Sequence, residues 1–404
     1  MPQATNRRDF FRSTLTAAAA GVAAQTAACS GSSSARTGEA AAGPTYASLG
    51  IKPVINGIGT VTMLGGSIMP PEVVDAMVEA SKSFVPLSEL QLKAGAHLAK
   101  LIGVPAAMIS CGAASAITAG TAAAVTRGDE EKLRALPLTE GLPNEIVQQK
   151  AHRSGYEAQM WLVGTKTVWV ETREELEKAI NERTAMMFFL NKNDPDGQIK
   201  RQEWIEVAKK HNIPTLNDAA ADVPPPERLH SYVDEGFDMV IFSGGKGLIG
   251  PQASGLLLGR ADLIAAGQKA ISPAGGIGRG MKVGKEEIMG LLAAVERYLK
   301  TDHAAERAEL DRRAAHVTDT LKGLDGVATE IDVPEIANRV PHVIVKWDEA
   351  AKGLTSAEAA EKLMAGDPPV AVSRGGDGAL RISMWMLRSG EEQVVASRVR
   401  GLFA

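Results

Sequence analysis

One lysine with glycines around it, Lys246, is the residue most able to do chemistry in this sequence. It follows the apolar run 238–242 and precedes a second apolar run, 254–259. Both runs have the composition of buried strands. Burying an unpaired ammonium is costly, and desolvation lowers the pKa of a lysine toward a reactive neutral amine. Lys246 could therefore form a Schiff base with a carbonyl cofactor, although a solvated lysine beside a glycine turn would have the same pattern.

The carbonyl cofactor that we expect on Lys246 is pyridoxal 5'-phosphate (PLP). An enzyme that uses PLP must also supply side chains that bind its ring and its phosphate. The glycines beside Lys246 would leave room for a ring to approach the backbone. An acid must lie beside the pyridine nitrogen, and Asp218 ends an apolar run one helix-and-strand unit before Lys246. That spacing suits two neighbouring strands whose ends face one cofactor. Asp218 could instead cap the helix that follows it.

A turn of small residues could bind the phosphate. It follows the strand-like run 106–110, precedes an alanine-rich helix and consists of Gly112, Ala113, Ala114 and Ser115. Unpaired N–H groups at such a helix start bind anions, but close packing of a helix on a sheet also favours small residues. Ser243 could add a hydroxyl, and Arg279 could either contact the phosphate or be a solvated surface residue.

Two further residues could complete the site. His152 could stack on the cofactor ring, or it could be an ordinary packed histidine. Arg381 is expected on a strand and could bind a substrate carboxylate with both arms of its guanidinium. A structural ion pair is the alternative for Arg381.

Alternating apolar runs and helical segments must position these groups. From 106 to 259 they predict an α/β fold with a doubly wound, mostly parallel sheet. Ligands bind at the carboxyl ends of such strands, where Ser110, Asn191, Asp218 and Ser243 fall. A long helix over 285–321 should then lead to a smaller α/β unit. We therefore expect an N-terminal arm and large domain over 48–290 and a small domain over 291–404.

Composition limits the partners. The net charge is −4 and aromatic residues make up only 4% of the chain. Neither a basic field nor stacking platforms for nucleic acid are therefore expected. The seven histidines show no paired ligand spacing, so no metal site is expected.

The N-terminus resembles an export signal. Arg7 and Arg8 precede a weakly apolar, alanine-rich run over 15–28, which predicts a twin-arginine signal over 1–29 and a flexible linker over 30–47. The sequence before Cys29 resembles a lipoprotein cleavage box. The protein is therefore expected in the periplasm or, if Cys29 carries a lipid, anchored to a membrane. A plain signal peptide cleaved near the alanines is the alternative.

Several motifs occur together and in order along the chain. They are Val54-Ile55-Asn56, Leu64-Gly65-Gly66-Ser67, Ser110 to Ala114, His152-Arg153-Ser154-Gly155-Tyr156, Asp218-Ala219-Ala220-Ala221, Ser243-Gly244-Gly245-Lys246, Gly250-Pro251-Gln252, Gly278-Arg279-Gly280-Met281 and Val283 to Glu287. Together they resemble the selenocysteine-synthase-like branch of fold-type I PLP enzymes, and most closely the D-glucosaminate-6-phosphate ammonia-lyase group. The resemblance extends from Ser48 to the C-terminus.

The resemblance implies an aminotransferase-like fold with PLP bound to Lys246. It also implies Asp218 at the pyridine nitrogen, His152 on the ring, and a homodimer or larger homo-oligomer with shared sites. Asn56 and Arg381 are expected to contact the substrate. The export signal separates this chain from its cytosolic relatives and disfavours a tRNA substrate.

The expected reaction is α-proton abstraction by Lys246 from an amino acid or amino sugar acid, β-elimination and ammonia release. The substrate could be unphosphorylated, unlike that of the ammonia-lyase group. Three alternatives stay open: an amino-acid racemase or aldolase, a selenocysteine-synthase-like transferase, which is disfavoured, and a non-catalytic exported binding protein. The sequence does not identify the substrate or choose which bond breaks after the first carbanion.

Overall fold

The computed structural model describes residues 43–403. The predicted export signal and Cys29 lie outside these residues. The chain divides into two compact units, 1–52 and 53–404. In the first unit, a short 3-10 helix, η1 (Ala47–Leu49), lies within and just beyond the predicted linker. The rest of the fold belongs to the second unit.

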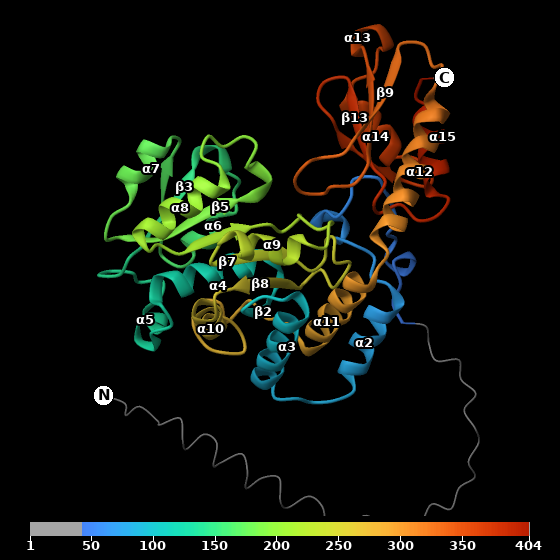
Figure 1. Cartoon of the computed structure of the whole chain (residues 1–404). Coiled ribbons are helices and arrows are strands. Elements are labelled where there is room, and N and C mark those ends of the chain that lie inside the picture. Colours follow the sequence, from blue (N-terminus) through green and yellow to red (C-terminus); the bar gives the residue numbers. More distant parts are fainter. Residues whose placement is uncertain (1–42, 404) are drawn as a thin grey trace, which may run out of the picture. The chain divides into compact units, whose positions relative to one another are not determined.

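A seven-stranded sheet forms the centre of the second unit (Figure 1). Its strand order is β2-β8-β7-β6-β5-β3-β4, and β8 alone runs against the other six. The predicted doubly wound, mostly parallel sheet is therefore confirmed. The strands are β2 (Ala106–Ser110), β3 (Glu145–Gln149), β4 (Lys166–Val170), β5 (Thr184–Leu190), β6 (Thr215–Asp218), β7 (Met239–Ser243) and β8 (Gly255–Gly259).

Helices cover both faces of this sheet, as the central strand β5 shows. All its residues are buried, with Met187 and Phe189 in one core and Met186 and Phe188 in the other. Alternate side chains of a strand point to opposite faces, so both faces must be covered. One face carries α3 (Leu87–Ile102), α7 (Arg173–Ala179), α8 (Arg201–His211), α9 (Arg228–Glu235) and α11 (Lys285–Lys300), and the other carries α4 (Gly112–Thr126), α5 (Glu130–Ala135), α6 (Glu157–Trp161) and α10 (Ala261–Ala270).

The single helix expected over 285–321 is two helices. The first, α11, packs along α2 (Pro71–Ser81) and ends at Lys300, and α12 (His303–Leu321) follows. The Asp302 carboxylate accepts a hydrogen bond from the backbone N–H of Ala305. This N-cap restarts the helix, because a capping residue takes a non-helical backbone conformation. The domain boundary expected after residue 290 falls inside α11.

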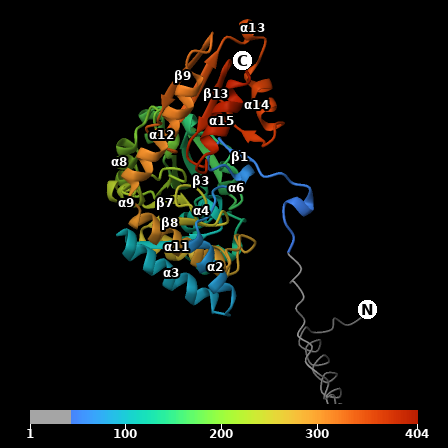
Figure 2. The ribbon, with the colours of Figure 1, turned by 90° about the vertical axis from the view of Figure 1, so that its right-hand side faces the viewer.

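The C-terminal part has its own apolar core. An antiparallel sheet of order β12-β13-β10-β9 packs there with helices (Figure 2). The N-terminal strand β1 (Ile55–Asn56) pairs in parallel with β11 (Val370–Ala371), so the N-terminal arm joins this part. Its other elements are β9 (Val327–Asp332), β10 (His342–Trp347), α13 (Glu349–Lys352), α14 (Ser356–Met364), β12 (Ser373–Arg374), β13 (Ala379–Ser383) and α15 (Glu391–Arg400).

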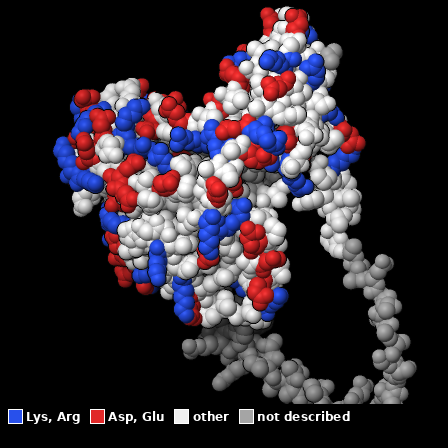
Figure 3. All heavy atoms as spheres, turned by 45° about the vertical axis from the view of Figure 1, so that its right-hand side comes forward, with Lys and Arg blue, Asp and Glu red and all other residues white. Residues whose placement is uncertain are grey.

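Charged side chains of both signs are interspersed on the face shown in Figure 3. Many form local ion pairs, such as Arg312 with Glu309. Within residues 43–403, no helix is both long enough and apolar enough to cross a membrane. The same stretch holds no group of three or more His, Cys, Asp or Glu side chains that could bind a metal.

Candidate active site

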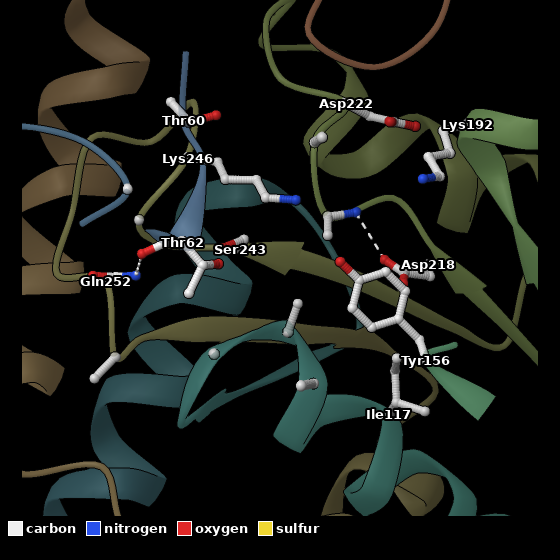
Figure 4. A pocket seen from close by; sticks show the side chains of 18 of the residues that line it. Thr60, Thr62, Ile117, Tyr156, Lys192, Asp218, Asp222, Ser243, Lys246 and Gln252 are labelled. Atoms are coloured by element: carbon white, nitrogen blue, oxygen red, sulfur yellow. Dashed lines mark hydrogen bonds between the residues drawn. The ribbon is translucent and has the colours of Figure 1, made fainter. Parts of the chain in front are cut away.

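The carboxyl ends of neighbouring strands open onto a cavity of about 390 Å³. Strands β6 and β7 are parallel neighbours that end in Asp218 and Ser243, as their sequence spacing predicted. Figure 4 shows Lys246 extending into the space between them. Six of the residues predicted for the site line this cavity together: Gly112, Ala113, Ala114, Asp218, Ser243 and Lys246.

Lys246 has the environment expected of a reactive amine. Its ammonium forms no hydrogen bond or ion pair with the described residues. Burial lowers its pKa, and the negative charge of Asp218 opposes this shift without cancelling it. A lysine with a lowered pKa loses its proton more readily and becomes a nucleophile and a base.

The glycines around Lys246 were expected to leave room for a cofactor ring. Gly244 and Gly247 instead allow neighbouring segments of the chain to pack closely. A Cβ on Gly244 would lie 2.0 Å from Oγ of Ser254, and one on Gly247 would lie 2.1 Å from the carbonyl oxygen of Val223. Both distances are far below van der Waals contact. Gly112 differs, because its Cβ would meet nothing within 4 Å but its φ is +76°. This left-handed conformation favours glycine.

Asp218 is a buried carboxylate, and few hydrogen bonds from the protein offset the cost of its burial. It is 5% exposed, and its one hydrogen bond to the described residues comes from the backbone N–H of Ala220 to Oδ1, at 3.0 Å. Burial raises its pKa, and the charge of Lys246 opposes the shift. A cation beside this carboxylate would offset the cost of its burial. The site therefore fits a protonated pyridine nitrogen.

The start of α4 fits a phosphate. No side chain caps this helix at Cys111, and Gly112, Ala113 and Ala114 line the cavity. The first N–H groups of a helix lack partners and bind anions. Ser115 instead turns inward, where its Oγ accepts a hydrogen bond from the N–H of Cys111 at 3.2 Å. The donors and the carboxylate around this cavity are thus those that PLP requires.

The structure does not bring His152 to the cavity. The side chain is fully buried, its ring packs edge-on against Phe189 at 4.4 Å, and Nδ1 accepts a hydrogen bond from the N–H of Leu190. Tyr156, four residues later, lines the cavity and is 47% exposed (Figure 4). The motif 152–156 therefore identified the correct loop, but Tyr156 is the aromatic residue that reaches the site.

The buried carboxylate of Glu157 holds this loop. It accepts hydrogen bonds from Nε2 of Gln148 at 2.9 Å and from the N–H groups of Ser154 and Gly155 at 2.9 and 2.5 Å. Such bonds are stronger with a charged acceptor. They fix the backbone immediately before Tyr156.

Three other predicted residues do not line the cavity. Arg381 forms an ion pair with Asp332, with 2.7 Å between Nη1 and Oδ2, as its alternative interpretation expected. Asn56 closes its own turn, because Oδ1 accepts a hydrogen bond from the N–H of Gly59. This turn leads the chain to Thr60 and Thr62, which do line the cavity. Arg279 is exposed in the segment after α10.

Two charged residues of the cavity were missed by the sequence interpretation, Lys192 and Asp222. Lys192 follows directly after Asn191, at a strand end that the pattern did indicate. Oδ2 of Asp222 accepts hydrogen bonds from the hydroxyl of Tyr232 at 2.9 Å and from Nδ2 of Asn191 at 2.5 Å. Burial raises the pKa of Asp222 to about 6. No sequence signal marked Asp222, which follows the recognised motif 218–221.

We expect acid to destabilise the protein partly through His152. Burial lowers its pKa from 6.5 to about 4 in the folded protein. In the unfolded chain, the His152 imidazole therefore binds a proton as the pH falls below 6.5. In the folded chain it binds that proton only near pH 4. The free energy of unfolding should decrease between pH 7 and pH 5, by about 2 kcal/mol for this histidine.

Urea unfolding of the wild type and of His152→Gln at pH 7 and pH 5 measures this effect. The variant should lose about 2 kcal/mol less than the wild type over this interval. An equal loss in both proteins would contradict a buried, neutral His152.

Comparison with known proteins agrees with this geometry. The L-seryl-tRNA selenium transferase family matches residues 152–324. D-glucosaminate-6-phosphate ammonia lyase of Salmonella typhimurium is 30% identical over 333 residues, which cover 80% of this chain and 87% of that protein. A 5'-C-glycyluridine monooxygenase-decarboxylase of a Streptomyces species is 32% identical over 338 residues, which cover 80% and 83%.

A solved structure of D-glucosaminate-6-phosphate ammonia-lyase has the same fold. It matches with a TM-score of 0.76 and 29% identity, over 89% of this chain and 98% of that chain. The predicted fold type and the cofactor PLP are thereby confirmed. The chain belongs to the family of fold-type I PLP-dependent enzymes that contains D-glucosaminate-6-phosphate ammonia-lyase.

Proposed function

We propose that this protein is a PLP-dependent ammonia-lyase that acts on an amino acid or amino sugar acid with a β-hydroxyl group. One observation carries the proposal. Lys246, Asp218 and the start of α4 surround a single cavity in a chain that shares 30% identity with an ammonia-lyase over most of its length. The overall reaction converts the β-hydroxy amino acid to a 2-keto acid and ammonia, with the water lost in elimination regained in hydrolysis.

Each residue of the site has a defined task. PLP, when bound, supplies an electron sink for the negative charge that forms at the α-carbon. The N–H groups at the start of α4 would hold the phosphate, and Asp218 would keep the proton on the pyridine nitrogen. Lys246 would hold the cofactor in the resting enzyme, and its free amine would accept the α-proton. Its lowered pKa suits this role, because a neutral amine is needed.

The competing chemistry on the same scaffold comes from the relative named as a monooxygenase-decarboxylase. An enzyme with that monooxygenase-decarboxylase activity would consume oxygen and release carbon dioxide. A racemase would instead return the proton to the α-carbon without losing ammonia. The racemase and aldolase alternatives share the first proton transfer with the lyase, so the products must decide between them.

The test is incubation of the holoenzyme with a panel of D- and L-hydroxy amino acids in deuterated buffer. The lyase predicts equal amounts of ammonia and keto acid, without oxygen consumption and with loss of both products in Lys246→Ala. Deuterium at the α-carbon without ammonia would identify a racemase. An aldehyde product would identify an aldolase, and oxygen uptake with carbon dioxide would identify a monooxygenase-decarboxylase.

We further propose that Lys192 binds the substrate carboxylate. It is the cavity-lining cation besides Lys246 among the described residues, whereas Arg381 is paired with Asp332. Replacing Lys192 with methionine removes a charged hydrogen bond, which should raise KM about 10- to 100-fold. Arg381→Met, the matched variant, should change KM less than about 3-fold. Steady-state kinetics measure both KM values. A larger rise in KM for Arg381→Met than for Lys192→Met would identify Arg381 as the residue that binds the substrate carboxylate.

Export and assembly are also proposed. The arginine pair at 7–8 and the run 15–28 support export by the twin-arginine route, and the residues before Cys29 support lipid attachment there. The family relationship supports a homodimer or larger homo-oligomer. Cell fractionation with and without Arg7→Lys/Arg8→Lys tests the export, and light scattering of the holoenzyme tests the assembly.

A further inference from the structure

A second cavity, of about 340 Å³, lies beside Lys246. Its walls come from the segment 58–63 of the N-terminal arm and from the C-terminal part. Lys246 and Tyr156 line both this space and the cofactor cavity. We call it the tail cavity, because a substrate whose α-carbon lies at Lys246 would extend its remaining atoms into it.

The tail cavity has no fixed charge apart from Lys246 among the described residues that line it. Its walls contain no Asp, Glu or Arg, and the one histidine is His342. Burial and the neighbouring Arg381 lower the pKa of His342 to about 4, so its ring is neutral at neutral pH. With Lys246 engaged by the cofactor, a phosphate monoester would lose water here without gaining a cation from these walls, which is costly.

The polar groups of the tail cavity are instead hydroxyls and an amide. Hydroxyls come from Thr60, Thr62 and Ser383, and an amide comes from Asn338. These groups both donate and accept hydrogen bonds, as sugar hydroxyls do. Trp385 adds an apolar aromatic surface that suits the C–H groups of a polyhydroxylated chain.

The backbone just before Asn338 is held in a strained conformation at Ala337. Ala337 and Asn338 have φ values of +56° and +48°, in the left-handed region that disfavours alanine but that asparagine adopts more readily than most residues. The N–H of Asn338 donates a hydrogen bond to the carbonyl oxygen of Ala221 at 2.8 Å, close to Asp218 in sequence. Strain of this kind persists where the surrounding structure demands it, commonly at functional sites. It places Asn338 at the junction of the tail cavity and the cofactor site.

We propose that the tail cavity selects an unphosphorylated, polyhydroxylated amino acid, and that Asn338 is a specificity-determining residue for its hydroxyl groups. The proposal rests on the proposed lyase function and specifies its substrate class. It separates this chain from the relative whose name specifies a 6-phosphate ester.

The first experiment compares D-glucosaminate with D-glucosaminate 6-phosphate as substrates of the holoenzyme. The unphosphorylated compound should have a kcat/KM at least about 10-fold higher, because a phosphate in this cavity gains no charged partner. Thr62→Lys, which adds a cation at an exposed part of the wall, should raise kcat/KM for the phosphate ester about 10-fold. Leu138→Lys, which lines neither cavity, should not. A preference of the wild type for the phosphate ester would overturn the proposal.

The second experiment tests Asn338 with Asn338→Gly. Glycine tolerates the positive φ, so this variant removes the amide without adding strain. KM for D-glucosaminate should rise about 5- to 10-fold, while kcat changes less than about 3-fold. Asn338→Asp, which keeps the shape but adds a negative charge, should raise KM further for the phosphate ester than for D-glucosaminate. An unchanged KM in Asn338→Gly would remove Asn338 from the proposal.

Titration calorimetry of the holoenzyme measures its affinity for both compounds and for serine, which has no polyhydroxylated chain. Together with the ammonia assay, it tests the tail cavity separately from the lyase activity. Tighter binding of D-glucosaminate without ammonia release would support the tail cavity and contradict the lyase. Ammonia release with a preference for the phosphate ester would support the lyase and contradict the tail cavity. Binding of D-glucosaminate no tighter than serine would overturn the assignment of the tail cavity.

Discussion

Replacing Lys246 with alanine is expected to lower kcat by at least about 10³-fold, because the variant lacks the base for the α-proton. It should also lose the visible absorption of the lysine-bound cofactor. The variant should fold, since the side chain forms no hydrogen bond or ion pair with the described residues and its burial lowers its pKa. Stopped assays of ammonia, an absorption spectrum and a thermal melt measure these three properties.

Lys322→Ala is the matched control for this prediction. Lys322 is exposed at the end of α12 and lines neither cavity, so its loss should change neither the spectrum nor kcat. A Lys246→Ala protein that keeps the absorption band and the activity would remove Lys246 from the site.

Replacing Asp218 with asparagine is expected to lower kcat about 10²- to 10³-fold while leaving the protein without cofactor at least as stable as the wild type. The amide has the same shape but cannot hold a proton on the pyridine nitrogen, so stabilisation of the developing charge is lost. Stability should not fall, because the variant removes a buried carboxylate that has one hydrogen bond within the described chain. Steady-state kinetics and urea unfolding of the cofactor-free protein measure the two effects.

Asp222→Asn is the informative comparison. Oδ2 of Asp222 accepts two hydrogen bonds, from Tyr232 and Asn191. The amide oxygen of an asparagine can take its place, but it is uncharged and accepts these bonds more weakly. This variant should therefore lose stability, by about 1–3 kcal/mol. If Asp218→Asn were the more destabilising of the two, Asp218 would be a structural carboxylate, as its capping alternative proposed.

The mostly parallel sheet and six residues that line the cavity could be predicted from the sequence because they depend on local patterns. Apolar runs that end in Asp218 and Ser243 determine the positions of neighbouring parallel strands, and the carboxyl ends of such strands meet at one edge of the sheet. The small residues 112–114 mark the start of a helix for the same local reason. These groups therefore lie together as expected.

The residues that could not be predicted depend on tertiary contacts. The partner of Arg381 is Asp332 on β9, a pairing that requires the register of three strands. Tyr156 lines the cavity and His152 does not, and Glu157 fixes the loop between them. The break between α11 and α12 depends on one capping side chain, Asp302, inside a region of continuous helical spacing. The walls of the tail cavity come from segments up to 327 positions apart, from Ile58 to Trp385, so no local pattern could assemble them.

Reduction of the holoenzyme with borohydride, followed by peptide mass spectrometry, tests the central claim most directly. Borohydride converts the bond between a lysine and PLP into a stable secondary amine, so the modified peptide reports which lysine holds the cofactor. We predict a pyridoxyl-phosphate mass on the peptide that contains Lys246 and on no other. The same mass on Lys192, or no modified peptide from protein that carries stoichiometric PLP, would contradict the assignment of Lys246.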